Sequence, residues 1–433
     1  MIKLSTHNPI LVAAGWLIFL FSCSNLIAAD EKPPARLPLD DLRIFAEAFD
    51  RISSAFVEEI DDRVLLESAV KGMLLDLDPH SAYLDRESFS HLEESTTGNY
   101  GGLGLEVDLD DGFIKIISPM DDTPADKAGI EAGDLIIQLD EQPVKGMSLG
   151  EAIELMRGEP GSSIKLTIAR EGELRPLEMT LIREVIEVSS VRHRFLEDGY
   201  GYLRIAQFQT NTGADVLAAL QEMQQEDALP GLIIDLRNNP GGVLQAAVDV
   251  SNAFIDDGLI VYTEGRLPSS DLKFNASSGD QLDGTAIVVL VNSGSASASE
   301  IVAGALQDHD RAVIMGTTTF GKGSVQTILP LNDEKAIKLT TARYYTPNGR
   351  SIQAEGITPD IWVERSTVTR IKRHPLRVTE RNLPKHLVNP DGTSDTEDEE
   401  PVQAEDVAVN DYQLNEALTL LKGLNILARK ASK

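Results

Sequence analysis

About two thirds of the way along the chain stands Asn292-Ser-Gly-Ser-Ala-Ser-Ala-Ser-Glu300, between an apolar run, Ala286–Val291, and a helix-like segment, Ile301–His309. An apolar strand that stops in a turn of small residues and then opens a helix presents hydroxyl groups beside unpaired N–H groups and a partial positive charge. Such a turn suits a nucleophile and its oxyanion. The same serines also suit plain caps and turn residues. Both readings stay open on this stretch alone.

Strands and helices alternate on both sides of this stretch. The expected strands are Tyr202–Phe208, Leu232–Leu236, Ala286–Val291 and Ala312–Met315. The expected helices are Asp215–Met223, Val243–Phe254 and Ile301–Leu306. This alternation predicts an α/β fold. A further strand, Ala336–Tyr345, is expected to end at the turn Thr346-Pro-Asn-Gly349.

An earlier block, about Gly98 to Arg183, resembles a PDZ domain. The resemblance rests on Gly102-Leu-Gly-Leu105, on Pro124-Ala-Asp-Lys-Ala-Gly-Ile130 and on the following Gly133-Asp134. In that family Gly102, Leu103, Gly104 and Leu105 would form the loop that binds a carboxylate, because glycines let successive N–H groups turn toward an anion. A peptide C-terminus would then add as a strand. A tight glycine bend without a ligand is the alternative.

Helical periodicity recurs toward both ends of the chain. Apolar residues repeat every three or four positions in Leu39–Ile60, and Arg63–Leu77 and Tyr412–Lys430 are also predicted helices. Between the core and the last helix, a mixed segment turns acidic over Asp391–Asp406, which is typical of a solvated linker. We expect the terminal helices either to associate with another copy or to pack against their own subunit.

Composition excludes several classes of function. The chain has 433 residues, 42% of them hydrophobic, which is enough for two or three domains. Its net charge of −30 argues against nucleic-acid binding, since phosphate neutralisation needs clustered Lys and Arg.

Met1–Ala29 is typical of a secretory signal. Lys3 precedes an apolar run, Pro9–Phe21, and Ala28 and Ala29 precede an acidic residue. A periplasmic or envelope location is therefore expected. The single cysteine, Cys23, lies in this segment, so the mature chain has no disulfide and no cysteine metal site. Lipidation of Cys23, although Phe21 fits it poorly, is the one route to a membrane anchor that the sequence leaves open.

Two motifs invite functions that their context does not support. Gly146-Met-Ser-Leu-Gly150 matches a hydrolase nucleophile elbow, but Ser148 and Glu151 form a capping box at the start of a predicted helix, Leu149–Arg157. Gly316-Thr-Thr-Thr-Phe-Gly-Lys322 approaches a phosphate loop, but Gly323 stands where a magnesium-binding hydroxyl belongs. Neither a metal nor a nucleotide cofactor is expected.

The candidate chemistry needs a base for Ser297. The glycine-rich junction Asp235–Gly242 follows a buried strand, and the N–H groups of Gly242 and Ala298 are predicted to form an oxyanion hole. Lys322, flanked by glycines, can accept a proton if burial lowers its pKa, and Gln326 is placed to orient its amine. His309 lies at the far end of the helix that Ser297 begins. The other histidines fall outside the α/β segments: His7, His80, His91, His193, His374 and His386.

At this point the chain resembles the carboxyl-terminal processing peptidases, or tail-specific proteases, from about Leu39 to Glu364. The matching motifs, in the family's order, are Gly102-Leu-Gly-Leu105, Asp235-Leu-Arg-Asn-Asn-Pro-Gly-Gly242, Gly294-Ser-Ala-Ser-Ala-Ser-Glu-Ile301 and Thr319-Phe-Gly-Lys-Gly-Ser-Val-Gln326. The resemblance implies Ser297 as nucleophile, Lys322 as general base and Gln326 as its positioner, with the amides of Gly242 and Ala298 as oxyanion hole. Asp308 falls where the family has an acidic residue implicated in activity. Its place at the helix end favours a structural role.

The resemblance also implies an α/β core shared with Clp-type peptidases and crotonases, interrupted by a PDZ domain that delivers or gates substrate. The expected division is a signal peptide 1–29, an N-terminal helical region 30–97, a PDZ domain 98–183, a peptidase core 184–365, a linker 366–410 and a C-terminal helix 411–433.

The sequence therefore predicts a periplasmic serine endopeptidase with a Ser297/Lys322 dyad that recognises the C-termini of envelope proteins and cleaves nearby. The expected partners are peptides with free C-termini, a second copy of the chain and, as an open question, an adaptor protein. A PDZ scaffold without catalysis is the main alternative, and an acyl-CoA enzyme on a crotonase-like fold is the third.

Overall fold

The structure is a computed structural model that describes residues 38–110, 112–225, 229–277, 279–332, 334–367, 383–387 and 411–431. The predicted signal segment with Cys23 and the acidic run Asp391–Asp406 lie outside the described residues. The chain divides into two units, one ending at Gly72 and the other beginning at Met73. None of the helices in the described ranges has the length and apolarity of a membrane span.

The first unit contains α1 (Leu39–Ala55) and most of α2 (Asp62–Leu75), which confirms the two predicted N-terminal helices. No residue of α1 is buried. Its predicted apolar face is exposed at Leu39, Leu42, Phe45, Ile52 and, just past the helix, Phe56.

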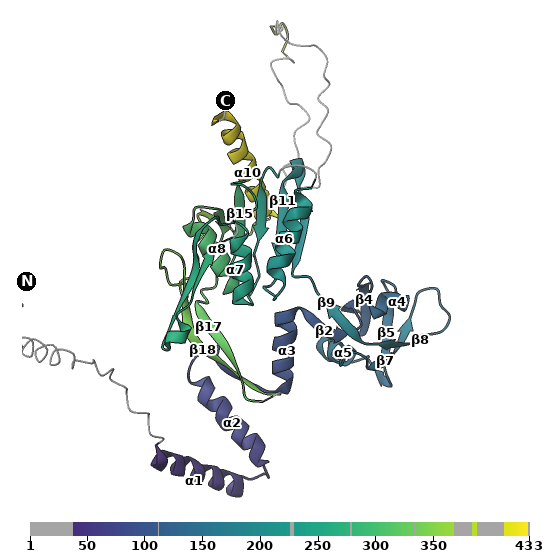
Figure 1. The fold of residues 1–433 in the computed structure, drawn as a ribbon. Coiled ribbons are helices and arrows are strands. Elements are labelled where there is room, and N and C mark those ends of the chain that lie inside the picture. The colour runs from purple at the N-terminus through teal and green to yellow at the C-terminus, as the bar shows by residue number, and fades with distance from the viewer. Residues whose placement is uncertain are drawn as a thin grey trace, which may run out of the picture. The chain divides into compact units, whose positions relative to one another are not determined.

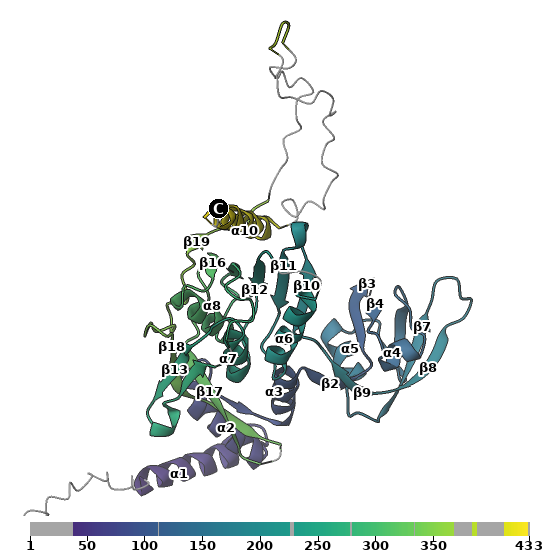
Figure 2. The ribbon, with the colours of Figure 1, turned by 45° about the horizontal axis from the view of Figure 1, so that its top comes forward.

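The centre of the second unit is a six-stranded sheet with the order β10-β11-β12-β15-β16-β19. The strands are β10 (Val191–Phe195), β11 (Gly201–Ile205), β12 (Leu232–Asp235), β15 (Ile287–Val291), β16 (Val313–Gly316) and β19 (Ile361–Trp362). All neighbouring pairs are parallel except β10 with β11. The crossover helices are α6 (Thr212–Met223), α7 (Leu244–Asn252) and α8 (Ala298–Asp308) (Figures 1 and 2). The predicted α/β fold is confirmed.

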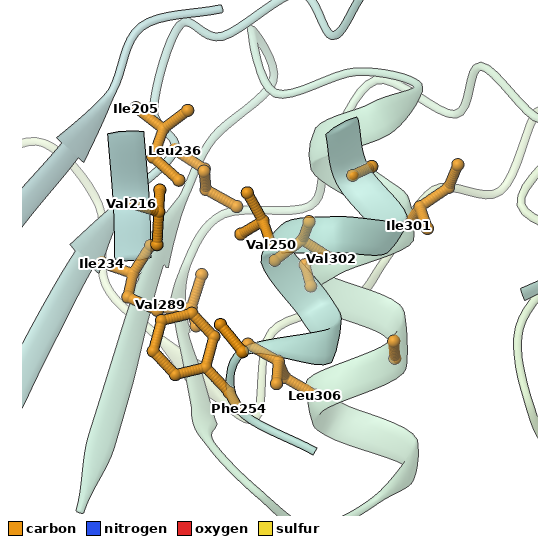
Figure 3. Packing of buried hydrophobic residues seen from close by; sticks show 14 of the residues in the cluster. Ile205, Val216, Ile234, Leu236, Val250, Phe254, Val289, Ile301, Val302 and Leu306 are labelled. Atoms are coloured by element: carbon orange, nitrogen blue, oxygen red, sulfur yellow. The ribbon is translucent and has the colours of Figure 1, made fainter. Parts of the chain in front are cut away.

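Both faces of this sheet are covered at its centre, which explains why β15 is a continuous apolar run and β12 is apolar up to Asp235. Successive side chains on a strand point to opposite faces. Ile234 and Val289 therefore pack toward α7 and α8, in one buried cluster with Val302 of α8 and with Phe254, which follows α7 (Figure 3). Their neighbours Ile233, Val288 and Leu290 face the other side.

That other face is covered by α10 (Tyr412–Ala431). Leu414, Leu418 and Leu421 are buried against the sheet. Of the two arrangements that the sequence allowed for the last helix, the structure shows packing on the same subunit. The buried leucine face is therefore not free for self-association, because the hydrophobic face of the chain's own sheet already covers it.

Leu418→Ala is expected to lower the free energy of unfolding by about 2–4 kcal/mol, because it leaves a cavity between α10 and the sheet. Urea denaturation measures this change. Ile426→Ala on the same helix is the matched control, since Ile426 is 55% exposed and Leu418 only 3%. Equal stability of the two variants would contradict the packing of α10 on this sheet.

A second, five-stranded sheet lies beside the candidate site. Its strands are β1 (Ala82–Leu84), β13 (Gly258–Gly265), β14 (Lys273–Ala276), β17 (Ser324–Pro330) and β18 (Ala336–Tyr345), and the long β17–β18 pair is plain in Figure 1. β1 pairs with β18 from far away in the sequence, with Ala82 opposite Lys338. Helix α3 (Arg86–Thr97) follows β1 and ends at Gly98, whose φ of 78° is left-handed.

The PDZ-like block forms its own sheet and core. The sheet contains β3 (Leu105–Asp110), β4 (Phe113–Pro119), β5 (Leu135–Leu139), β6 (Gln142–Pro143), β7 (Ser163–Ala169) and β8 (Leu177–Ile182), with helices α4 (Pro124–Lys127) and α5 (Leu149–Met156). A separate ladder pairs β2 (Asn99–Gly102) with β9 (Glu184–Glu187). Ser148 caps α5 in a capping box with Glu151, as predicted, so it is no nucleophile elbow.

Candidate active site

Ser297 occupies the turn between β15 and α8. It is the N-cap residue of α8, is 6% exposed, and has a φ of 55° and a ψ of −111°. A positive φ is costly for a residue with a Cβ, and such backbone strain clusters at functional sites. The backbone of Ser297 therefore departs from the extended conformation of an ordinary helix N-cap.

The glycine-rich turn after β12 contacts the Ser297 turn. A Cβ atom on Gly241 would lie 2.8 Å from the Cβ of Ser297 and 3.0 Å from the nitrogen of Ala298. A Cβ on Gly242, whose φ is 144°, would lie 2.0 Å from the carbonyl oxygen of Phe208. Only glycine fits at these two positions. The N–H groups of Gly242 and Ala298 donate to no acceptor among the described residues.

The neighbouring serines have structural roles, as their second interpretation predicted. The hydroxyl of Ser295 donates to the carbonyl of Leu236 at 2.8 Å, and that of Ser299 donates to the carbonyl of Asn239 at 3.0 Å. Both bonds join the Ser297 turn to the glycine-rich turn. The two turns therefore form one buried, hydrogen-bonded layer at the carboxyl ends of β12 and β15.

Lys322 lies in the loop between β16 and β17 and is half-buried. Burial lowers the pKa of its amine below 10.5, the positive charge of Lys338 lowers it further, and the negative charge of Glu300 opposes the shift. No hydrogen bond joins the amine to the Ser297 hydroxyl, both of which belong to described residues. The Ser297 side chain is instead within hydrogen-bonding reach of Tyr344 on β18.

Tyr344 is a site residue that the sequence did not single out. Its side chain is 5% exposed. Burial raises the pKa of its phenol to about 12, although the hydrogen bond with Ser297 acts in the opposite direction. The phenol therefore stays protonated at neutral pH.

Gln326 lies on β17, four residues after Lys322. Its amide nitrogen donates to Ser324 Oγ at 2.9 Å and to Thr340 Oγ1 at 3.3 Å. Neither of these bonds reaches Lys322. Lys322 therefore lies in the loop that leads into β17 and Gln326 on β17 itself, without a direct hydrogen bond between their side chains.

Glu300 joins the elements that carry Ser297 and Lys322, and it too was missed as a site residue. Its side chain is fully buried and accepts hydrogen bonds from four groups. The donors are Ser297 N at 2.8 Å, Thr319 Oγ1 at 2.5 Å, Gly321 N at 2.7 Å and Lys322 N at 2.9 Å. The Ser-x-x-Glu spacing of a capping box was the available signal.

His80 lies nearer to the candidate site than its position in the sequence suggested. It precedes β1, outside the α/β segments, but the pairing of β1 with β18 brings its loop toward Lys322. Burial and the nearby charge of Lys322 lower the pKa of His80. His309 is placed as expected, away from the turn, with Nε2 2.7 Å from the carbonyl oxygen of Leu259.

Asp308 binds the turn that follows β18. Its carboxylate accepts a hydrogen bond from Asn348 N at 2.9 Å and forms an ion pair with Arg350. At about 1.5 Å per residue, α8 separates Asp308 from Ser297 by roughly 15 Å. Its contacts fit the structural role that its position favoured.

The loop Gly102–Leu105 lines a pocket of about 210 Å³ in the PDZ-like block. β3 contributes Leu105 and Val107, and α5 contributes Ile153 and Met156. A slot between a strand edge and a helix, closed by a glycine loop, has the form that takes an extended peptide as an added strand. The four loop residues are thus brought to one pocket.

The fold and this site define a serine-type peptidase with a PDZ domain. The profile of peptidase family S41 matches residues 199–363, a PDZ profile matches residues 115–170, and a profile of the N-terminal domain of the activating protease CtpB matches residues 24–88. The chain belongs to peptidase family S41, among the carboxy-terminal processing proteases.

Relatives cover most of the chain. A carboxy-terminal-processing protease of Bartonella bacilliformis is 46% identical over 382 residues, which cover 88% of each protein. The carboxy-terminal processing protease CtpA of Bacillus subtilis is 34% identical, over 82% of this chain and 75% of that one. A solved photosystem II D1 C-terminal processing protease is 32% identical, with a TM-score of 0.45 over 74% of this chain and 92% of that one.

Proposed function

We propose that this protein is a periplasmic endopeptidase that cleaves envelope proteins near their C-terminal ends, with Ser297 as nucleophile and Lys322 as general base. The observation that carries the proposal is the buried carboxylate of Glu300, which ties the backbone of Ser297 to that of Lys322. Lys322 adds a second support, since a lysine whose pKa is lowered by burial is suited to act as a general base.

The proposed reaction passes through an acyl-enzyme. The neutral Lys322 amine takes the proton of the Ser297 hydroxyl while its oxygen attacks the peptide carbonyl. The N–H groups of Gly242 and Ala298 stabilise the oxyanion, each by about 3–4 kcal/mol. The lysine then gives its proton to the leaving amine, and water releases the acyl group by the same steps. Every proton is carried by this chain's own groups.

Before attack, the Ser297 hydroxyl has to come within hydrogen-bonding distance of the Lys322 amine, because no hydrogen bond joins these two described side chains. Binding of a peptide C-terminus in the PDZ pocket is the event that we assign to this change, with an adaptor protein as a further partner. The exposed apolar face of α1 is the candidate contact with a second copy. We expect the protein to associate with the membrane only if Cys23 is lipidated.

The role of the PDZ pocket is tested with a loosely folded substrate that has a free or an amidated C-terminus. Amidation removes the negative charge that the N–H groups of the Gly102–Leu105 loop would bind, so we expect kcat/KM to fall about tenfold. The Ser297→Ala protein is assayed for binding of the same two substrates. Equal cleavage of both would remove the pocket from the mechanism, and tight binding without any Ser297-dependent cleavage would favour the scaffold alternative.

The rate should rise with pH as Lys322 loses its proton. The midpoint of this rise should lie below pH 10.5, because the pKa of Lys322 is lowered from that ordinary lysine value. The charged groups facing Lys322 are Lys338, Glu300 and His80. Lys338→Met removes a positive charge that lowers the pKa of Lys322, so the pKa rises and the rate increase moves to higher pH. Lys273→Met, which removes an exposed charge from β14 of the same sheet, should leave the profile unchanged. A shift to lower pH would contradict Lys322 as the base.

A further inference from the structure

The amide of Gln326 is held by two hydroxyl groups. Its nitrogen donates to Ser324 Oγ and to Thr340 Oγ1, the latter directly across the β17–β18 pair. Gln326 Nε2 therefore has both hydrogens in use, and Oε1 has no donor among the described residues. An amide held by its nitrogen presents its oxygen as a fixed acceptor.

The Thr340 hydroxyl is itself oriented by a carboxylate. It donates to Asp78 Oδ1 at 3.1 Å. A carboxylate only accepts hydrogen bonds, so the single hydrogen of Thr340 is committed to Asp78 and only its lone pairs face Gln326. A reversed Gln326 amide would place its oxygen against these lone pairs. Asp78 thus fixes the orientation of the Gln326 amide through the Thr340 hydroxyl.

Several further hydrogen bonds hold Asp78 and its loop in place. Asp78 Oδ1 also accepts from the N–H groups of His80 and Ser81, at 2.8 and 3.0 Å, and Oδ2 accepts from Ser81 Oγ at 2.6 Å. These hydrogen bonds lower the pKa of Asp78, although burial opposes them, so it stays ionised at neutral pH. Thr340 N donates to Ser81 Oγ at 3.1 Å, which fixes the loop to β18.

We propose that Asp78 and Thr340 are positioning residues of the peptidase: Asp78 orients the Thr340 hydroxyl, and Thr340 holds the Gln326 amide so that its oxygen is free to accept from Lys322. The Lys322 amine then donates to Gln326 and keeps its lone pair for the proton of Ser297. This inference rests on the proposed function. It assigns a role to a loop that is remote in sequence from the α/β segments.

Thr340→Val removes the hydroxyl at nearly constant shape. We expect kcat to fall about tenfold with KM unchanged, because the amide is no longer held in one orientation. Thr340→Ser keeps the hydroxyl and should restore the rate. Asp78→Asn keeps an acceptor and should stay near the wild type, whereas Asp78→Ala should match Thr340→Val.

A double-mutant cycle separates positioning from general support of the fold. In a Gln326→Ala protein, Thr340→Val should cause no further loss, since its effect passes through the amide. A loss that multiplies with that of Gln326→Ala, or full kcat in Thr340→Val alone, would overturn the inference.

A readout without catalysis keeps this test apart from that of the proposed function. In the Ser297→Ala protein, the side-chain amide resonances of Gln326 are assigned by their loss in Gln326→Ala. We expect them to shift in Thr340→Val and to stay in place in Thr340→Ser. A wild type without Ser297-dependent cleavage would refute the proposed function. Unshifted Gln326 resonances in Thr340→Val would instead refute the positioning of the Gln326 amide by Thr340.

Discussion

Ser297→Ala is expected to lower kcat by a factor on the order of 10⁴ to 10⁶, the range seen when a serine peptidase loses its nucleophile. The reason is that no acyl-enzyme can form, while the N–H groups of Gly242 and Ala298 remain. Release of peptide from a loosely folded substrate measures the effect. The fold should be unchanged, since the hydrogen bonds of the turn to Glu300 use the backbone of Ser297.

Ser293→Ala is the matched control, because Ser293 is an exposed serine of the same turn. It should keep wild-type activity. Lys322→Ala should approach the loss of Ser297→Ala, and the double variant should lose little more, because the two side chains act as one unit. Ser297→Ala protein with more than about a hundredth of wild-type kcat would refute Ser297 as the nucleophile.

Glu300→Gln is expected to lower stability and activity together. One carboxylate oxygen accepts from the N–H groups of Ser297 and Lys322, and the other accepts from Thr319 and Gly321. Glutamine would turn an NH₂ group toward one of these donor pairs. Leaving a buried donor unpaired costs about 1–3 kcal/mol, so we expect the free energy of unfolding to fall by roughly 2–5 kcal/mol.

The same change should lower kcat by about 100-fold or more, because the Lys322 loop loses its tie to the Ser297 turn. It should also move the pH at which the rate rises downward, since Glu300 raises the pKa of Lys322. Glu355→Gln, a substitution of an exposed glutamate near the same loop, is the control for urea denaturation and kinetics. Glu300→Gln protein with wild-type stability and rate would show that the carboxylate does not join the two elements.

The sequence by itself determined the α/β core, because its signals are local. The buried strands β12 and β15 are rich in apolar residues, and each is followed by a glycine-containing turn and a helix. The predicted strand Leu232–Leu236 and helix Val243–Phe254 correspond to β12 and α7 to within a few residues at either end. The PDZ-like glycine loop and the Ser148 cap could be predicted for the same reason, since turns and helix caps depend on residues a few positions apart.

Tertiary structure alone decided which distant groups meet. The pairing of β1 with β18 brings Asp78 to Thr340 and His80 toward Lys322, and no local pattern encodes that pairing. Burial of Tyr344 beside Ser297 and of Glu300 between two loops depends on how the two sheets pack. The leucine periodicity of α10 predicted a buried face but not its partner, because an apolar stripe is satisfied equally by another copy or by its own sheet.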